Sequence, residues 1–305
     1  MIMDKKQIVP EYKPENFSAF IETDEKHWKD KTINDFFISK LSTTKVKLRT
    51  PFLPHRKTVN DFVWVTKGRL EQTVYNEHYH LSAGSILLLA PEKIRTIDLL
   101  SEDIEGFYCH FSDDFIAKND QIKYLLEILN YLDSHNRYVI PVDSADTLLP
   151  LLNRMERLNN SEKNERNTQL ISFYLMCFLG ELKEIIKTLP EIKWTANEKL
   201  VLKFKKAVTK NIHKIHNVHE YASMLNVTPN HLNKCVKDFT GSTASEFINK
   251  FLMIEAKAFL SIFEMSISEA AYAIGISDPS YFARFFKKQS GMTPREYRKM
   301  IDLSS

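Results

Sequence analysis

Thr228–Gly241 reads TPNHLNKCVKDFTG, and Asp278–Gly291 repeats the same pattern as DPSYFARFFKKQSG. The two stretches align at an offset of 50 residues without a gap, and the match continues to Glu246 and Glu296. Self-similarity of this length is the sequence signature of a repeated structural unit. Because only two copies occur, the pattern predicts a paired module and not a solenoid.

Each copy is predicted to contain two helices joined by a short turn. In the second copy, Ser266 and Glu269 have the S-x-x-E spacing of a capping box, and Gly275 ends the helix that they start. Asp278 is a suitable N-cap, and Pro279 suits the first helical position, where no N–H is needed. Small residues inside the first helix let the second helix cross it closely, as a helix-turn-helix requires.

The first copy follows the same plan, with a turn at Asn226-Val227 and a helix cap at Thr228. Between the copies, Thr243–Glu246 forms another capping box and starts a helix that is predicted to end near Leu260. At about 1.5 Å per residue this helix is about 25 Å long. It has apolar residues on more than one side, so we expect it to be buried against several neighbours. Two units on one rigid helix could enter major-groove faces that are about 34 Å apart.

About a hundred residues, from Asn197 to Arg298, resemble the DNA-binding domain of AraC/XylS-type transcription regulators. The resemblance is carried by ISEAAYAIGISDPSYFARFFKKQSGMTPREYR, which ends at Arg298, and by Glu255-Ala256-Lys257 of the connecting helix. It implies a bacterial regulator that binds promoter DNA and, if it is an activator, RNA polymerase. One departure is that the connecting helix often carries basic residues where this sequence has Phe251 and Leu252. These two residues argue against a phosphate contact there and indicate an additional packing surface.

The exposed polar residues of each second helix are the predicted DNA contacts. In the first unit they are Asn230, His231, Asn233, Lys234 and Lys237. In the second unit they are Ser280, Tyr281, Ala283, Arg284, Lys287, Lys288 and Arg295.

Side-chain chemistry divides these residues into two groups. Asparagine donates and accepts in pairs, which suits adenine, whereas lysine and arginine suit guanine O6 and N7. By resemblance, the base-reading positions are Asn230, Asn233, Lys234, Ser280, Tyr281, Ala283 and Arg284, of which alanine can touch only a thymine methyl group. The remaining basic residues suit phosphate, which positions a protein without specifying sequence. For each lysine, a solvated surface charge is an alternative interpretation.

Charge is distributed unevenly along the 305 residues, a length that allows two domains or more. Residues 191–305 contain 17 Lys and Arg and 11 Asp and Glu, a net charge of +6. The whole chain carries +3, so residues 1–190 carry −3. This asymmetry is expected of a chain in which one part binds nucleic acid.

Three features predict a cytoplasmic protein. Met1–Pro10 has no apolar core of the kind that a signal peptide needs. The longest apolar run, Ile171–Leu179, is far shorter than the roughly 20 residues of a membrane span. Cys109, Cys177 and Cys235 are widely separated, which fits a reducing compartment and neither a disulfide framework nor a zinc site.

Residues 1–112 are predicted to consist mostly of strands. Short apolar and β-branched runs such as Asp61–Thr66 and Ile86–Ala90 alternate with Gly, Asn and Pro, which is typical of a sandwich or barrel. In AraC-like proteins the N-terminal domain is a cupin-type β-barrel, and Val65–Pro91 looks like its central hairpins. The predicted fold class is therefore α+β, with a cupin-like β-barrel, a helical segment and an all-α domain with two helix-turn-helix units.

The inside of a barrel is where a small-molecule effector is expected, because barrel mouths are common ligand pockets. Candidate lining residues are His55, Trp64, Tyr75 and Tyr108, although ordinary packing is the simpler interpretation of each. His78 and His80 would lie on one face of a strand, but the carboxylate that a metal cupin needs does not follow them. The sequence therefore predicts neither a metal nor another cofactor.

Helical spacing of apolar residues begins after Asp113 and continues to Leu189. The last helix, Leu170–Leu189, has more apolar residues than one packing face requires. It forms either intradomain core or a homodimer interface, and AraC-like proteins dimerise in this region. The predicted divisions are a sensor domain at 1–112, a helical dimerisation segment at 113–190, a linker at 191–197 and a DNA-binding domain at 198–305.

Three functions are alternatives for a chain with these features. The first is a ligand-responsive transcription regulator whose partners are double-stranded promoter DNA, a second copy of the chain and a small molecule. The second is a metal-dependent cupin enzyme with a DNA-binding tail, which lacks the carboxylate after His78-x-His80, any nucleophile arrangement and any Gly-rich phosphate loop. The third is a regulator controlled by a protein partner. The sequence favours a regulator that is not an enzyme, and it leaves the third function open.

Overall fold

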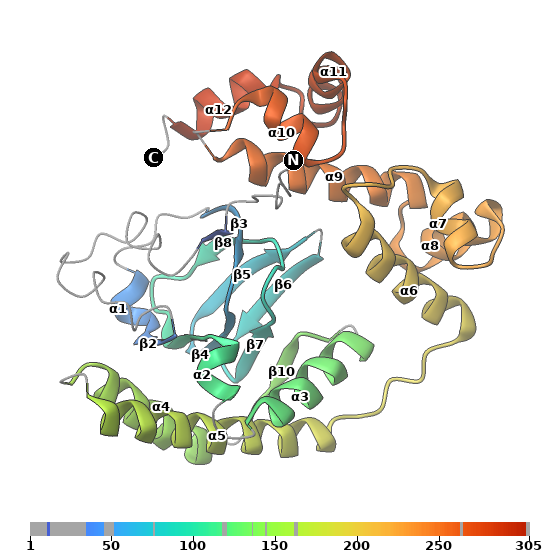
Figure 1. The fold of residues 1–305 in the computed structure, drawn as a ribbon. Helices are drawn as coiled ribbons and strands as arrows, with labels where there is room; N and C mark the ends of the chain where they lie inside the picture. Colours follow the sequence, from blue (N-terminus) through green and yellow to red (C-terminus); the bar gives the residue numbers. More distant parts are fainter. Residues whose placement is uncertain are drawn as a thin grey trace, which may run out of the picture. The chain divides into compact units, whose positions relative to one another are not determined.

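A computed structural model of the chain describes residues 11–12, 35–45, 52–75, 77–117, 121–135, 137–143, 145–161, 164–262 and 265–302. These residues form two compact parts (Figure 1), one mainly from residues 56–192 and the other mainly from residues 193–305. The first, called the β-rich part below, contains strands and helices. The second, called the helical part, contains the two repeated units.

The strands form two five-stranded sheets. One has the order β10-β7-β4-β9-β2, formed by Val139–Pro141, Ser85–Leu89, Asn60–Lys67, Glu105–Phe111 and Phe36–Lys40. The other has the order β1-β3-β8-β5-β6, formed by Glu11–Tyr12, Phe52–Lys57, Arg95–Leu100, Arg69–Val74 and Glu77–Ser82. Among the described strands the two sheets stay separate, so the predicted closed barrel is not observed. Alternation and turn spacing predict strands, whereas closure depends on strand tilt and stagger, which that pattern does not encode.

Strand β4 lies in the centre of the first sheet and is buried on both faces. It pairs antiparallel with β7 through Val63 and Leu87, and with β9 through Val63 and Tyr108. Side chains alternate across the sheet. Val63, Val65 and Tyr108 therefore pack in a core with side chains of the second sheet, while Phe62 and Trp64 pack in a core with the helices.

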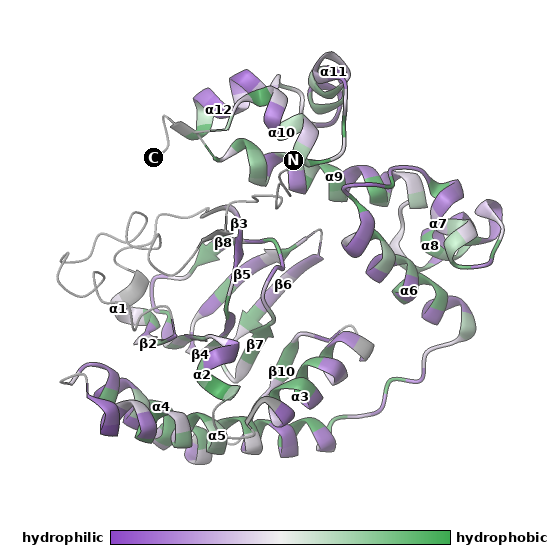
Figure 2. Ribbon diagram, in the orientation of Figure 1, coloured by the Kyte–Doolittle hydropathy of each residue, from purple (hydrophilic) through white to green (hydrophobic). Residues whose placement is uncertain are grey.

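Helices cover the face of the β4 sheet that carries Phe62 and Trp64. They are α2 (Asp113–Ala117), α3 (Gln121–His135), α4 (Ala145–Asn159) and α5 (Glu165–Thr188), and α1 (Leu41–Lys45) lies between β2 and β3 in the chain. Hydrophobic and hydrophilic residues alternate along α4 and α5 (Figure 2), as expected for helices with one buried face. Phe178 of α5 stacks on Phe62 of β4 with ring centroids 4.6 Å apart.

Most apolar residues of α5 belong to the core of their own chain. Ile171, Leu175, Phe178, Leu179, Leu182 and Ile186 are buried there, which confirms the intradomain-core interpretation for these residues. The exposed large apolar side chains nearby are Phe173 of α5 with Tyr124 and Leu126 of α3. Among the described residues of α3 and α5, these three are the large apolar side chains most accessible to another molecule.

The helical part contains α6 (Ala196–Asn211), α7 (Val218–Met224), α8 (Pro229–Thr240), α9 (Ala244–Leu260), α10 (Ile267–Ala273), α11 (Pro279–Ser290) and α12 (Pro294–Asp302). The first unit is α7 with α8, the second is α10 with α11, and α9 connects them (Figure 1). The predicted length of α9 is confirmed at 17 residues. Phe251 and Leu252, where a phosphate contact was judged absent, are buried, so the expectation of a packing surface is confirmed.

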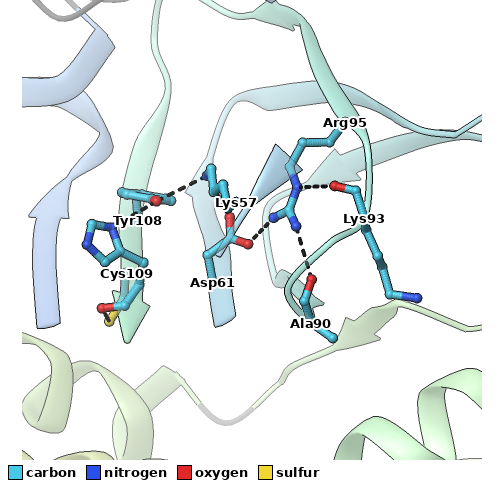
Figure 3. Close-up of polar contacts among 8 residues, drawn as sticks. Lys57, Asp61, Ala90, Lys93, Arg95, Tyr108 and Cys109 are labelled. Carbon is cyan, nitrogen blue, oxygen red and sulfur yellow. Dashed lines mark hydrogen bonds and ion pairs between the residues drawn. The ribbon is translucent and has the colours of Figure 1, made fainter. Parts of the chain in front are cut away.

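A buried ionic cluster interrupts the apolar core between the sheets (Figure 3). It consists of Lys57, Asp61, Arg95 and Tyr108 and is called the Asp61 cluster below. The Lys57 ammonium donates to Asp61 Oδ2 at 2.8 Å and to the Tyr108 hydroxyl at 3.1 Å. The Arg95 guanidinium donates to Asp61 Oδ1 and, at 3.1 Å, to the carbonyl of Ala90. The exposed fractions of Lys57, Asp61 and Arg95 are only 4%, 3% and 1%.

Asp61 lies between two cations, and this position decides its ionisation. Burial by itself raises the pKa of Asp61, but the charges of Arg95 and Lys57 and their hydrogen bonds hold it below its ordinary value. Burial lowers the pKa of Lys57 to about 8, against the opposing effect of Asp61. Removing an ion from water costs several kcal/mol unless a partner compensates it, so both cations depend on this carboxylate.

Asp61→Asn is expected to lower the free energy of unfolding by about 3–5 kcal/mol, because it removes the charge of the carboxylate to which both buried cations donate. Urea unfolding followed by circular dichroism measures this loss. The matched control is Glu105→Gln, which breaks an ion pair with Lys67 whose side chains are 58% and 59% exposed. That change should cost at most about 1 kcal/mol. Equal losses in the two variants would show that burial of the cluster does not determine its contribution.

Candidate nucleic-acid interface

The helix starts of both units have the predicted caps. Thr228 Oγ1 accepts a hydrogen bond from His231 N at 3.2 Å, and Asp278 Oδ1 accepts one from Ser280 N at 2.8 Å. Ser266 with Glu269 and Thr243 with Glu246 form complete capping boxes, in which side chain and backbone bond in both directions. Prolines occupy the first positions of α8 and α11, where they remove no hydrogen bond.

The turns of the two units differ by one residue. Helices α8 and α11 align at an offset of 50, whereas the caps of the preceding helices, Asn217 and Ser266, are 49 residues apart. The turn of the first unit contains Asn226 at φ 56°, and the longer turn of the second contains Gly275 at φ 83°. The longer turn borders a hollow of about 340 Å³ lined by His216, Gly275, Ile276, Ser277, Asp278, Tyr281 and Arg284.

On α8, one face is buried and the opposite face carries the predicted DNA contacts. The buried residues are Leu232, Cys235 and Val236. The exposed residues are Asn230, His231, Lys234 and Lys237. His231 lies beside Cys235, with Nε2 3.7 Å from the sulfur.

Asn233 differs from the other predicted contacts of α8 because it bonds within the protein. Its Oδ1 accepts a hydrogen bond of 2.8 Å from the backbone N–H of Ala244, the first residue of α9. That N–H has no partner inside its helix and is buried, so it needs one elsewhere. The second unit has Pro294 at the equivalent position, which has no N–H, and Ala283 at the position equivalent to Asn233. This difference identifies Asn233 as a residue that joins α8 to α9.

On α11, the predicted contacts also lie opposite a buried face, formed by Phe282, Phe285 and Phe286. Ala283 is half-buried, and the exposed predicted contacts are Ser280, Tyr281, Arg284, Lys287 and Lys288, with Arg295 exposed on α12. Tyr281 is 53% exposed and stacks on Phe285 at a centroid distance of 6.4 Å. Tyr281 and Phe285 occupy the positions of His231 and Cys235 in the first unit.

His216 borders this surface but was not predicted from the sequence. It belongs to the loop before α7, and its Nε2 donates to the carbonyl of Ile274 at 3.0 Å in the second unit. Its place beside Tyr281 and Arg284 depends on a contact between residues 58 positions apart. One indirect signal of this contact is present in the sequence: Gly275 stands where the first unit has Asn226.

The residues proposed to line an effector site do not form one group. Tyr75 and Tyr108 pack in the core between the sheets, whereas Trp64 packs in the core with the helices, on the other face of β4. His55 is buried in β3. His78 and His80 are exposed on β6, and within the described residues no group of three His, Cys, Asp or Glu side chains is placed to bind a metal. A search of the same residues for a helix with the length and apolar character of a membrane span found none.

The chain is similar to several known proteins. A family model described as a helix-turn-helix domain matches residues 221–300, which include α8, α9 and α11. The HTH-type transcriptional regulator YisR of Bacillus subtilis is 23% identical over 257 residues, which cover 80% of this chain and 87% of YisR. The lactose operon transcription activator of Staphylococcus xylosus is 25% identical over 248 residues, covering 79% and 84%. The structure of ToxT from Vibrio cholerae aligns with a TM-score of 0.43 and 16% identity, covering 87% of this chain and 98% of ToxT.

Asn233→Ala is expected to lower the free energy of unfolding by about 1 kcal/mol, because the buried Ala244 N–H loses its acceptor. Ala244→Pro removes that N–H, and Thr243 already has the extended backbone (φ −64°, ψ 158°) that precedes proline. Asn233→Ala should therefore be nearly neutral in the Ala244→Pro background, which a double-mutant cycle by urea unfolding measures. An equal cost in both backgrounds would assign Asn233 another role.

Proposed function

We propose that this chain, whose residues 221–300 match a helix-turn-helix domain, is an AraC/XylS-type transcription regulator that binds promoter DNA with α8 and α11 in adjacent major grooves. The observation that carries this proposal is that α8 and α11 each have an exposed polar face and are joined by one buried helix, α9. The 17 residues of α9 span about 25 Å, which is compatible with two grooves about 34 Å apart when the width of the units is added.

Base reading is assigned to the exposed residues near the start of each recognition helix. Asn230 can pair with adenine through its amide, and Arg284 can donate two parallel hydrogen bonds to guanine. Lys234 suits guanine as a single donor, and Ser280, Tyr281, Ala283 and His231 lie where they can contact neighbouring base edges. Phosphate contacts are assigned to Lys237, Lys287, Lys288 and Arg295, which add affinity without sequence preference. Asn233 is assigned a positioning role because its oxygen bonds to Ala244 N.

The β-rich part is proposed to be a cupin-like sensor whose small-molecule effector binds between the sheets. Ionised side chains in a domain core are costly, and groups with perturbed pKa values cluster at functional sites. The Asp61 cluster and Tyr75 supply polar groups on that side of β4. A sugar-type effector is the hypothesis to test first, since one relative is named as an activator of a lactose operon.

A homodimer is proposed to form through the exposed apolar side chains of α3 and α5. Leu126 and Phe173 are 50% and 41% exposed, and Tyr124 is 38% exposed. Burial of apolar area between two copies would stabilise the dimer by roughly 25 cal/mol per Å². Dimerisation would place four recognition helices on one promoter, and RNA polymerase would be a further partner if the protein activates.

Selection of full-length protein on a random double-stranded DNA pool tests the proposal. An enriched site with two short blocks about one helical turn apart is the expected result. A duplicated site would support the dimer. If nothing is enriched, the selection is repeated with candidate sugars; failure in all conditions would reject sequence-specific binding.

Arg284→Ala is expected to cost about 1–3 kcal/mol of binding free energy and to relax base choice at one position of the site. The physical reason is the loss of two hydrogen bonds to one guanine. Anisotropy titration against the selected site and its single-base variants measures both effects. A uniform loss over all sequences would identify Arg284 as a phosphate contact instead.

Lys288→Ala is the matched control, because it removes a charge of the same helix without removing a base contact. It should weaken all sequences alike and reduce the slope of log affinity against log salt by about one. Titration over a salt series gives that slope. An unchanged slope would show that Lys288 is a solvated surface charge.

A further inference from the structure

The two helix-turn-helix units have a second connection besides α9. The loop Ile212–Asn217, which precedes α7 in the first unit, reaches the end of α10 in the second unit. His213 Nδ1 lies 3.0 Å from the carbonyl of Ala273, and His216 Nε2 lies 3.0 Å from the carbonyl of Ile274. Both units pack on α9, and the loop adds a second contact that further constrains the angle between them.

We propose that this loop is a clamp that orients α11 relative to α8, so that His213 and His216 determine which spacing of two DNA blocks the protein accepts. The inference rests on the proposed function and adds to it a source of spacing specificity. Neither histidine needs to touch a base. Both act by positioning the recognition helix that does.

Both histidines contact carbonyl groups at the C-terminal end of α10. The last carbonyls of a helix have no partner within it, and a carbonyl oxygen only accepts. Each histidine must therefore donate, His213 from Nδ1 and His216 from Nε2, which assigns them opposite tautomers when neutral. The negative end of the α10 dipole favours these donors. The loop before α7 thus caps the end of α10.

His213 also connects the clamp to α9. Its Nε2 lies 3.6 Å from the Glu255 carboxylate, which is fully buried on α9, and its ring meets Phe259 edge-on at 6.0 Å. A proton on this nitrogen would pair the ring with the carboxylate. One side chain of the first unit therefore contacts both the connecting helix and, through Ala273, the second unit.

Gly275 shows that the backbone of the loop is packed against the second turn. A Cβ atom at this position would lie 2.1 Å from the His213 carbonyl oxygen, closer than any two such atoms can approach. Gly275 has φ 83°, but that conformation alone does not require glycine, because Asn226 adopts φ 56° in the turn of the first unit. The backbone carbonyl of His213 in the clamp is what excludes a side chain at position 275.

The clamp also borders the proposed DNA-contacting surface. His216 lines the hollow that Tyr281 and Arg284 share. A change in the loop would therefore move the start of α11, where the base-reading residues lie. The first unit would not be affected in the same way, since its turn has Asn226 and no such loop against it in the described residues.

Gly275→Asn tests the clamp, because asparagine tolerates the left-handed turn, as Asn226 does, but its Cβ displaces the loop. The matched control is Gly291→Asn, where φ is 81° and a Cβ would meet no atom within 4 Å. Full-length wild type and both variants are titrated with three DNAs: the selected two-block site, the same site with one base pair inserted between the blocks, and a single block. Thermal unfolding of each variant detects any loss of folding.

Wild type and Gly291→Asn are expected to prefer the selected spacing by about tenfold, which corresponds to about 1.4 kcal/mol. Gly275→Asn should reduce this preference to about twofold while its affinity for the single block stays within about twofold of wild type. Retention of the full preference by Gly275→Asn, or its equal loss in Gly291→Asn, would overturn the clamp. A wild type that enriches no two-block site would instead reject the proposed function on which the clamp rests.

His216→Ala and His216→Gln give an independent test that does not depend on backbone strain. Alanine removes the donor to Ile274, whereas glutamine keeps an N–H donor of similar reach. His216→Ala should lower the spacing preference about threefold and glutamine should restore most of it, although both remove the imidazole. Equal behaviour of the two variants would show that the hydrogen bond does not set the spacing.

Discussion

Backbone groups at helix ends need partners, and the helical part of this protein is built around that requirement. Helices α7 and α10 have only seven residues each, which is too short to be stable alone. Asn217 and Ser266 cap their starts. At the end of α9, Arg298 of α12 donates to the carbonyls of Leu260 and Ile262 at 3.0 and 3.2 Å. The Arg298 cap joins α12 to the end of α9, so satisfying this helix end also sets the packing of two elements.

The same requirement explains why the two units are not identical. The start of α9 is an alanine and needs an acceptor, which Asn233 provides, whereas the start of α12 is a proline and needs none. The second unit has a longer turn and is held by histidines of the preceding loop. Helix α8 is therefore joined to α9 by a side-chain hydrogen bond, and the end of α10 is joined to the loop Ile212–Asn217. Under the proposed function, the reading of the two DNA blocks could be adjusted separately through these contacts.

In the β-rich part, the contrast is between an apolar core and a core that contains buried charges. The β4 sheet separates an apolar core under the helices from a second core that contains the Asp61 cluster. The first core consists of apolar side chains in close contact, as Phe62 stacked on Phe178 illustrates. The second has two cations and one carboxylate where apolar side chains would be less costly. A molecule bound beside the Asp61 cluster could change the charge balance of this core and the packing of the sheets.

Local chemistry in the sequence determined the helix starts, the turn positions, the length of α9 and the repetition of α8 as α11. Caps, turns and periodicity act over a few residues, so a pattern of nearby residues contains the necessary information. Which face of β4 carries Trp64, whether ten strands close into a barrel, and where the oxygen of Asn233 bonds depend on residues far apart in the chain. The contacts of His213 and His216 join residues about 60 positions apart and were likewise decided only by the tertiary structure, because no local pattern specifies a partner at that distance.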